Sequence, residues 1–144
     1  MVKFEHGGQV HRWKDIYPHL LDFSANINPL GLAKSIQNAL QNSLGEIVHY
    51  PEPFSCTLRA EIAVHYHLPE ESIFVGNGAA EILYLLARIL RPKRALVTAP
   101  TFGEYQRSLH GIGCEVEEVP LKRDFSFSFE EIQKRISQVE IAYF

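Results

Sequence analysis

The stretch that most constrains the fold is residues 73–90, where a short apolar run passes through a glycine turn into a periodic apolar segment. The run Ile73-Phe74-Val75 is typical of a buried strand, and Gly76-Asn77-Gly78 is typical of a tight turn. The apolar spacing of residues 79–90 predicts a helix. This strand–turn–helix order directs backbone N–H groups at the helix start toward an anion. The small residues there would let a phosphate approach the main chain closely: Gly78, Ala79 and Ala80.

The sequence after the turn alternates strand and helix patterns with short connections. We expect strands at 94–100, 114–119 and 139–144, and helices at 102–109 and 128–136. This alternation predicts an α/β fold, a mostly parallel sheet with helices on both faces.

The first half of the chain is less regular, with two predicted helices. One covers residues 33–44, and the other runs from an N-cap at Ser55 to Tyr66. A second N-terminal signal, the capping box Ser128-Phe129-Glu130-Glu131, is expected to start the last helix.

Composition and charge narrow the possible partners. The 144 residues are 46% hydrophobic and 22% charged, and the net charge of −3 argues against nucleic acid or an anionic membrane. The N-terminus has no apolar signal-peptide core, and the apolar stretch at 82–90 is too short to span a bilayer. Cys56 and Cys114 form no Cys-x-x-Cys pair, so we expect a cytoplasmic protein without a disulfide framework or zinc site.

Taken alone, the glycine turn leaves two interpretations open, a phosphate site and a plain tight turn. Glu81 stands where a dinucleotide fingerprint has its third glycine, and Ala99-Pro100-Thr101 supplies no acidic residue for a ribose. No Gly-Lys-Ser/Thr follows, which excludes a P-loop. These absences argue against a dinucleotide or nucleoside triphosphate.

Phe102 follows the strand at 94–100, at the sheet edge where parallel α/β folds bind ligands. The ring is a candidate to stack on a planar ligand, and the alternative is a core residue that packs on the following helix. The seven histidines are expected at the surface, because His65 and His67 would lie on different faces of a helix. No metal site is expected.

Several stretches, in this order and spacing, resemble the first part of the fold-type I pyridoxal-phosphate enzymes. Within that family they are most similar to the threonine-phosphate decarboxylases of cobalamin biosynthesis, with the histidinol-phosphate aminotransferases as the sister group. The stretches are His6-Gly7-Gly8, Asp22-Phe23-Ser24-Ala25-Asn26-Ile27-Asn28-Pro29-Leu30-Gly31, His49-Tyr50-Pro51-Glu52-Pro53, Gly76-Asn77-Gly78-Ala79-Ala80-Glu81 and Pro100-Thr101-Phe102-Gly103-Glu104-Tyr105.

The resemblance implies roles for individual residues. Gly78, Ala79 and Ala80 match the turn whose backbone holds the phosphate of pyridoxal 5'-phosphate, and Phe102 matches the aromatic residue that stacks on its ring. Tyr50 matches a tyrosine that reaches the cofactor phosphate of a partner subunit, which implies a homodimer. The resemblance also implies three residues near the phosphorylated amino-acid substrate: His6, Asn28 and Gly31.

The resemblance further implies a lyase reaction, the conversion of L-threonine O-3-phosphate to aminopropanol phosphate and CO₂. The alternatives are a histidinol-phosphate-type aminotransferase and a non-catalytic module. We expect residues 1–32 to form an arm and substrate loop, and residues 33–144 the first half of the cofactor-binding domain, in a truncated chain. No lysine stands in a context that matches the family's cofactor-linked lysine, so no covalent cofactor chemistry and no catalytic residue are expected in this chain.

Overall fold

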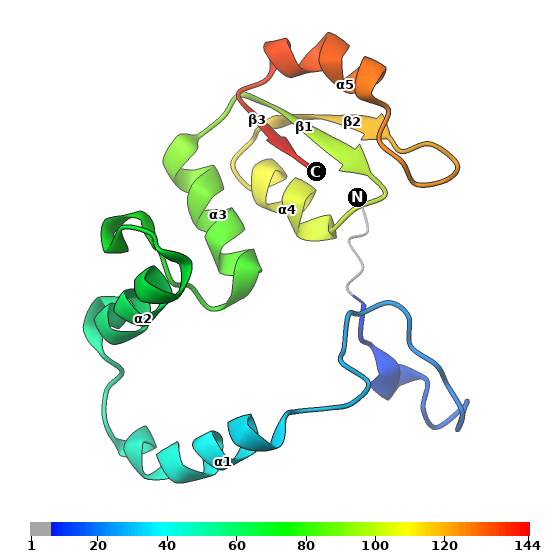
Figure 1. The fold of residues 1–144 in the computed structure, drawn as a ribbon. Helices are drawn as coiled ribbons and strands as arrows, with labels where there is room; N and C mark the ends of the chain where they lie inside the picture. Colours follow the sequence, from blue (N-terminus) through cyan, green and yellow to red (C-terminus); the bar gives the residue numbers. More distant parts are fainter. Residues whose placement is uncertain (1–6) are drawn as a thin grey trace. The chain divides into compact units, whose positions relative to one another are not determined.

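The computed structural model describes residues 7–144, which form two compact units, 7–75 and 76–144 (Figure 1). His6, which the resemblance implies to lie near the substrate, is outside the described residues. Each unit is described by itself.

The unit at 76–144 alternates helices and strands in the predicted order. It contains α3 (Gly78–Leu90), β1 (Arg94–Ala99), α4 (Gly103–His110), β2 (Glu115–Pro120), α5 (Phe129–Arg135), a 3-10 turn (Ile136–Gln138) and β3 (Ile141–Tyr143). The sheet order is β2-β1-β3, and β1 pairs in parallel with both neighbours. The predicted parallel α/β fold is therefore confirmed.

Alternate side chains of β1 enter two separate cores. Ala95 and Val97 pack with Ala87 of α3 and Leu109 of α4, whereas Leu96 packs with Val119 and with Ile132 of α5. The helices accordingly cover both faces of the sheet, with α3 and α4 on one and α5 on the other (Figure 1). Because successive strand residues point to opposite faces, a continuous apolar run suits a strand buried on both sides.

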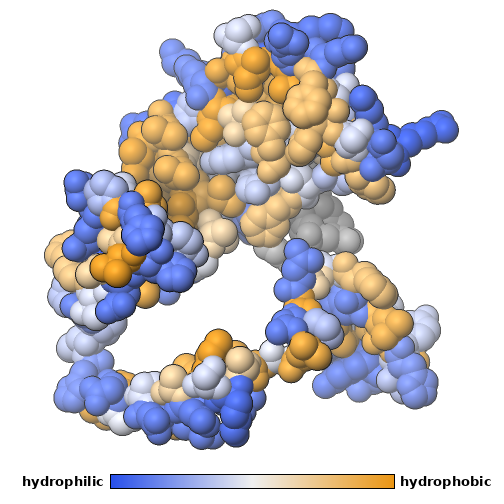
Figure 2. Space-filling view, in the orientation of Figure 1, coloured by the Kyte–Doolittle hydropathy of each residue, from blue (hydrophilic) through white to orange (hydrophobic). Residues whose placement is uncertain are grey.

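The unit at 7–75 is built from short elements. These are a 3-10 turn (Val10–Arg12), α1 (Lys34–Ser43), three further 3-10 turns (Leu44–Val48, Pro53–Ser55 and Glu70–Ser72) and α2 (Cys56–Tyr66). No residue between 7 and 75 is buried. The apolar side chains Ile36, Leu40 and Leu44, spaced by four as predicted, are exposed, and Figure 2 shows hydrophobic colour along one side of α1.

The strand predicted at 73–75 is not formed. Ile73 has extended backbone angles, but residues 73–75 have no strand assignment and pair with no β-strand in the described chain. A strand needs a neighbour for its hydrogen bonds, and an apolar run does not supply one.

Both predicted serine caps occupy the expected positions without making the expected bonds. Ser55 precedes α2 and Ser128 precedes α5, and neither side chain caps its helix. Glu52 caps α2 instead, because its carboxylate accepts from the Thr57 N–H at 2.8 Å and from the Thr57 hydroxyl at 2.9 Å. The capping-box prediction for Glu131 is wrong, since that side chain pairs with Lys134 and Arg135.

Within residues 7–144, none of the helices has both the length and the hydrophobicity required to cross a lipid bilayer.

Candidate functional site

The start of α3 is an open glycine turn. Gly78 has φ +81°, in the left-handed region that favours glycine, and its N–H donates to the Gly76 carbonyl at 2.8 Å. A Cβ built on Gly78 would meet no atom within 4 Å. The first N–H groups of a helix have no intrahelical acceptor, so an anion can approach them through this space. We call Gly78, Ala79 and Ala80 the phosphate cradle.

Glu81, inside the helix, makes a hydrogen bond back to the start of the same turn. Its carboxylate accepts from the Asn77 N–H at 2.6 Å. A Cβ on Gly76 would lie 2.9 Å from Ile82 Cγ1 and 3.1 Å from Glu81 Oε2, so a side chain cannot fit there without displacement. In the sequence, Glu81 stands out only as the residue at the position of the third glycine of a dinucleotide fingerprint. The bond resembles that of a capping box, but Glu81 stands four residues after the N-cap Asn77 and not three, so the capping-box pattern does not reveal it.

Phe102 lies at the start of α4, three residues after the end of β1. Its side chain is 42% exposed and meets Tyr105 edge-on, with the ring centroids 5.7 Å apart. Phe102 is therefore not a core residue. An aromatic ring with an accessible surface at the C-terminal end of a parallel strand can stack on a planar ligand.

A buried polar bridge connects α3 to α4. The Tyr84 hydroxyl donates to Glu104 Oε2 at 2.8 Å, and Arg107 Nη1 donates to Glu104 Oε1 at 3.4 Å. Partial burial, followed by the hydrogen bond to the carboxylate, raises the pKa of Tyr84 above its ordinary value, so the phenol stays protonated and acts as the donor. The sequence carries no signal of the contact between Tyr84 and Glu104, because no spacing rule connects two residues on different helices.

The other candidate residues lie in the unit at 7–75. Tyr50 is 99% exposed. Asn28 organises its own loop, since its Oδ1 accepts from the Leu30 N–H at 3.0 Å and its Nδ2 donates to the Gly31 carbonyl at 3.2 Å. Gly31 has φ +71°, which accounts for the glycine. The structure thus brings the phosphate cradle and Phe102 into one unit, and it describes Tyr50, Asn28 and Gly31 in the other.

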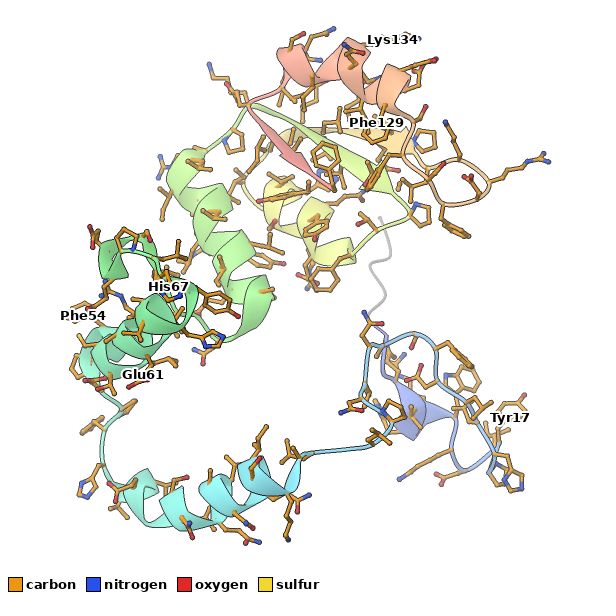
Figure 3. All side chains as sticks on the ribbon, in the orientation of Figure 1. Tyr17, Phe54, Glu61, His67, Phe129 and Lys134 are labelled. Atoms are coloured by element: carbon orange, nitrogen blue, oxygen red, sulfur yellow. The ribbon has the colours of Figure 1, made fainter. Side chains whose placement is uncertain are left out.

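Residues 7–144 contain no cluster of three histidine, cysteine or carboxylate side chains suited to a metal ion. His65 is the penultimate residue of α2, and His67 lies just beyond the end of that helix with left-handed backbone angles (Figure 3). Cys56 is exposed and Cys114 is buried, and both are free thiols.

The residues at 76–144 fit a phosphate joined to a planar ring. Main-chain donors at a helix N-terminus suit the phosphate, and the open side of Gly78 leaves room for it. The accessible ring of Phe102 suits an aromatic system. Both alanines of the cradle lack a hydrogen-bonding side chain, so the main chain would have to provide the contacts there.

The chain is similar to several known proteins. The threonine-phosphate decarboxylase of Salmonella typhimurium is 38% identical over 121 residues, which cover 81% of this chain and 33% of that protein. The crystal structure of the histidinol-phosphate aminotransferase from Clostridium acetobutylicum is 29% identical with a TM-score of 0.72, covering 85% of this chain and 36% of that one.

The structure of histidinol-phosphate aminotransferase from Sinorhizobium meliloti in complex with pyridoxal-5'-phosphate shares the fold, with a TM-score of 0.74 at 19% identity. That match covers 83% of this chain and 33% of the other. The chain thus spans about a third of the length of these relatives. The family of aminotransferases of class I and II matches residues 18–142, which confirms the resemblance drawn from the motifs. On this match, the chain belongs to the aminotransferase class I and II family.

Proposed function

We propose that this chain forms the cofactor-phosphate and ring-binding part of a pyridoxal-phosphate-dependent decarboxylase of the threonine-phosphate type. The observation that carries the proposal is the open phosphate cradle in the same compact unit as the accessible Phe102 ring. When bound, pyridoxal phosphate supplies an electron sink that allows a bond at the substrate α-carbon to break. The chain's own residues hold and orient the group.

The proposed roles differ by residue. The turn of Gly78, Ala79 and Ala80 binds the phosphate: the N–H groups of Ala79 and Ala80 donate to it, and Gly78 leaves the space open. Phe102 stacks on the ring and shields one face from water. Tyr50 is proposed to reach a cofactor phosphate in a partner subunit of a homodimer, in keeping with its full exposure.

His6, Asn28 and Gly31 are proposed to line the site of the phosphorylated amino-acid substrate. The Asn28 hydrogen bonds to Leu30 and Gly31 support this role, because they give the loop a defined shape. The proposed location is the cytoplasm.

Two reactions are compatible with the family. Decarboxylation of L-threonine O-3-phosphate is preferred because the Salmonella decarboxylase is 38% identical, whereas the Clostridium aminotransferase is 29% identical. Transamination of a histidinol-phosphate-type substrate is the second candidate, favoured by the structural match that covers 85% of the chain.

The reaction is tested on the product of the whole open reading frame that encodes this sequence. With pyridoxal phosphate and L-threonine O-3-phosphate, we expect release of CO₂ and formation of aminopropanol phosphate. Amino transfer from histidinol phosphate to 2-oxoglutarate without CO₂ release would instead establish the aminotransferase. If the protein shows neither activity, the enzyme proposal is contradicted and a non-catalytic module is favoured.

The site is tested on the chain itself with pyridoxine 5'-phosphate, which has the phosphate and ring but no aldehyde to react with surface lysines. Stacking beyond simple burial is worth about 0.5–1.5 kcal/mol, so Phe102→Ala should raise the dissociation constant about two- to twelve-fold by calorimetry. Phe125→Ala, which removes another exposed phenylalanine, is the matched control and should leave it unchanged. Failure of the wild-type chain to bind would overturn the proposed site.

We further propose that the chain binds the cofactor without a covalent link. After incubation with pyridoxal phosphate and borohydride, mass spectrometry should find no stoichiometric modification at one lysine. A single fully modified lysine would show that the chain contains a cofactor-linked residue after all.

A further inference from the structure

The bridge between α3 and α4 is built around a buried carboxylate. Glu104 is 4% exposed, and each of its oxygens accepts a hydrogen bond, one from the Tyr84 hydroxyl at 2.8 Å and one from Arg107 at 3.4 Å. A buried charge is strongly destabilising unless it has such partners. The carboxylate also lies in the first turn of α4, where the helix dipole favours a negative charge.

The bridge acts on the two helices that carry the two halves of the proposed site. Glu104 lies two residues after Phe102, and Tyr84 lies six residues after Gly78. At 1.5 Å of rise per residue, the Tyr84 position is about 9 Å along α3 from the phosphate cradle. A shift of α3 against α4 would therefore change the distance between the cradle and the Phe102 ring.

Apolar packing alone does not fix that distance. Ala87 and Leu109 meet in the core beneath α3 and α4, but hydrophobic contact is non-directional and tolerates small sliding and rotation. A hydrogen bond to a buried carboxylate has a narrow range of length and angle. The Tyr84–Glu104 bond supplies a directional restraint between α3 and α4.

We propose that Tyr84 and Glu104 are positioning residues that set the separation of the phosphate cradle from Phe102. They thereby make the site selective for a phosphate joined by a short link to a planar ring over free phosphate. The inference deepens the proposed function and rests on it. Inorganic phosphate needs only the cradle, whereas pyridoxine phosphate needs the cradle and the Phe102 ring at a spacing that its short CH2–O link can span.

The test compares two ligands on the same variant. Calorimetry gives the dissociation constants of pyridoxine 5'-phosphate and of inorganic phosphate for the wild type and for Tyr84→Phe, which removes only the hydroxyl. We expect about a ten-fold rise for pyridoxine phosphate and less than a two-fold change for phosphate. Partial unfolding raises both constants by the same factor, so the ratio separates positioning from a loss of folded protein.

Two controls and a second variant sharpen the result. Arg88→Gln changes an exposed arginine in the last turn of α3, outside the bridge, and should leave the ratio of the two constants unchanged. Tyr66→Phe removes the hydroxyl of an exposed tyrosine on α2 and should also have no effect. If Tyr84→Phe fails to fold, Glu104→Asp retracts the carboxylate by one methylene and should shift the ratio in the same direction.

An unchanged ratio in Tyr84→Phe, or in Glu104→Asp where that replaces it, would overturn the positioning role and leave the proposed function intact. Wild-type chain that binds phosphate but shows no preference for pyridoxine phosphate would overturn both. The two failures are therefore distinguishable.

Discussion

Two glycines two residues apart in the α3 turn are required for different physical reasons. Gly78 has left-handed backbone angles that other residues adopt at a cost, and a Cβ on it would meet open space. A Cβ on Gly76 would instead lie less than 3.2 Å from Ile82 and Glu81. The Gly-x-Gly motif alone does not show that the two glycines are required for different reasons. At this scale, the sequence predicted the turn, and the structure showed which glycine leaves room for a ligand.

Gly78→Ala should lower the free energy of unfolding by about 1–2 kcal/mol, because the left-handed conformation costs that much for an L-residue. Denaturant unfolding followed by circular dichroism measures the change. Gly45→Ala is the matched control, since Gly45 has no positive φ and its Cβ would also meet open space. Equal stability of Gly78→Ala and wild type would contradict the strained position.

Glu131 should make the protein sensitive to acid. Hydrogen bonds from Lys134, which points away from the sheet (Figure 3), and from Arg135 hold the pKa of Glu131 at about 2, below the ordinary 4.5. Because the folded state lowers this pKa, the ionised Glu131 stabilises the folded state at pH values above the unfolded-state pKa of 4.5. This contribution disappears as the pH falls from about 4.5 to 2.

Thermal melting between pH 6 and pH 2.5 tests this expectation. Glu131→Gln should lose less stability over that range than wild type, because the amide does not titrate. Glu130→Gln, at the neighbouring exposed position, should retain the wild-type slope. Parallel slopes for wild type and Glu131→Gln would show that this carboxylate does not contribute.

At the scale of the elements, the local sequence pattern predicted the positions of the helices but not the side chains that cap them. α2 and α5 lie where apolar spacing predicts them, yet Ser55 and Ser128 make no capping bond. Glu52 lies outside the helix and accepts the hydrogen bond of an N–H group in the first turn of α2, because the turn at Pro53–Ser55 brings its carboxylate back to Thr57. A side chain five residues away in sequence is not part of any capping pattern.

Glu52→Ala should destabilise the start of α2 by about 0.5–2 kcal/mol, the usual effect of losing an N-terminal cap. Amide hydrogen exchange at the first turn of α2 reports the change. Ser55→Ala is the comparison, and it should leave exchange nearly unaltered. A larger effect for Ser55→Ala than for Glu52→Ala would restore the cap predicted from the sequence.

At the scale of the whole chain, burial differs sharply between the two units. Residues 7–75 include no buried side chain, while the unit at 76–144 contains residues with no exposed surface, among them Leu96, Val97 and Leu109. Figure 2 nevertheless shows hydrophobic surface over α3, where Leu86, Ile89 and Leu90 remain exposed. Local stability follows buried apolar contact.

Hydrogen exchange should therefore be slowest in β1 and α4 and fast throughout residues 7–75. Leu109→Ala, which removes a fully buried side chain, should accelerate exchange in β1 and cost about 2–5 kcal/mol. Ile89→Ala, at an exposed position on α3, should have little effect. Protection in α1 as strong as in β1 would contradict this distribution.

Local patterns in the sequence were enough to predict the order of elements at 76–144 and the parallel sheet, and the resemblance of several motifs predicted the family. Apolar runs and turn residues act over a few neighbours, so strands such as β1 and helices such as α3 can be identified without a structure. The folded chain alone decided which predicted strand found a partner, that Glu52 caps α2, and that Tyr84 meets Glu104. The side-chain contact of Tyr84 with Glu104 joins residues 20 positions apart, and the pairing of β1 with β3 joins residues 46 positions apart, as in Ala95 and Ile141. Their geometry depends on how helices and strands pack, which no local pattern contains.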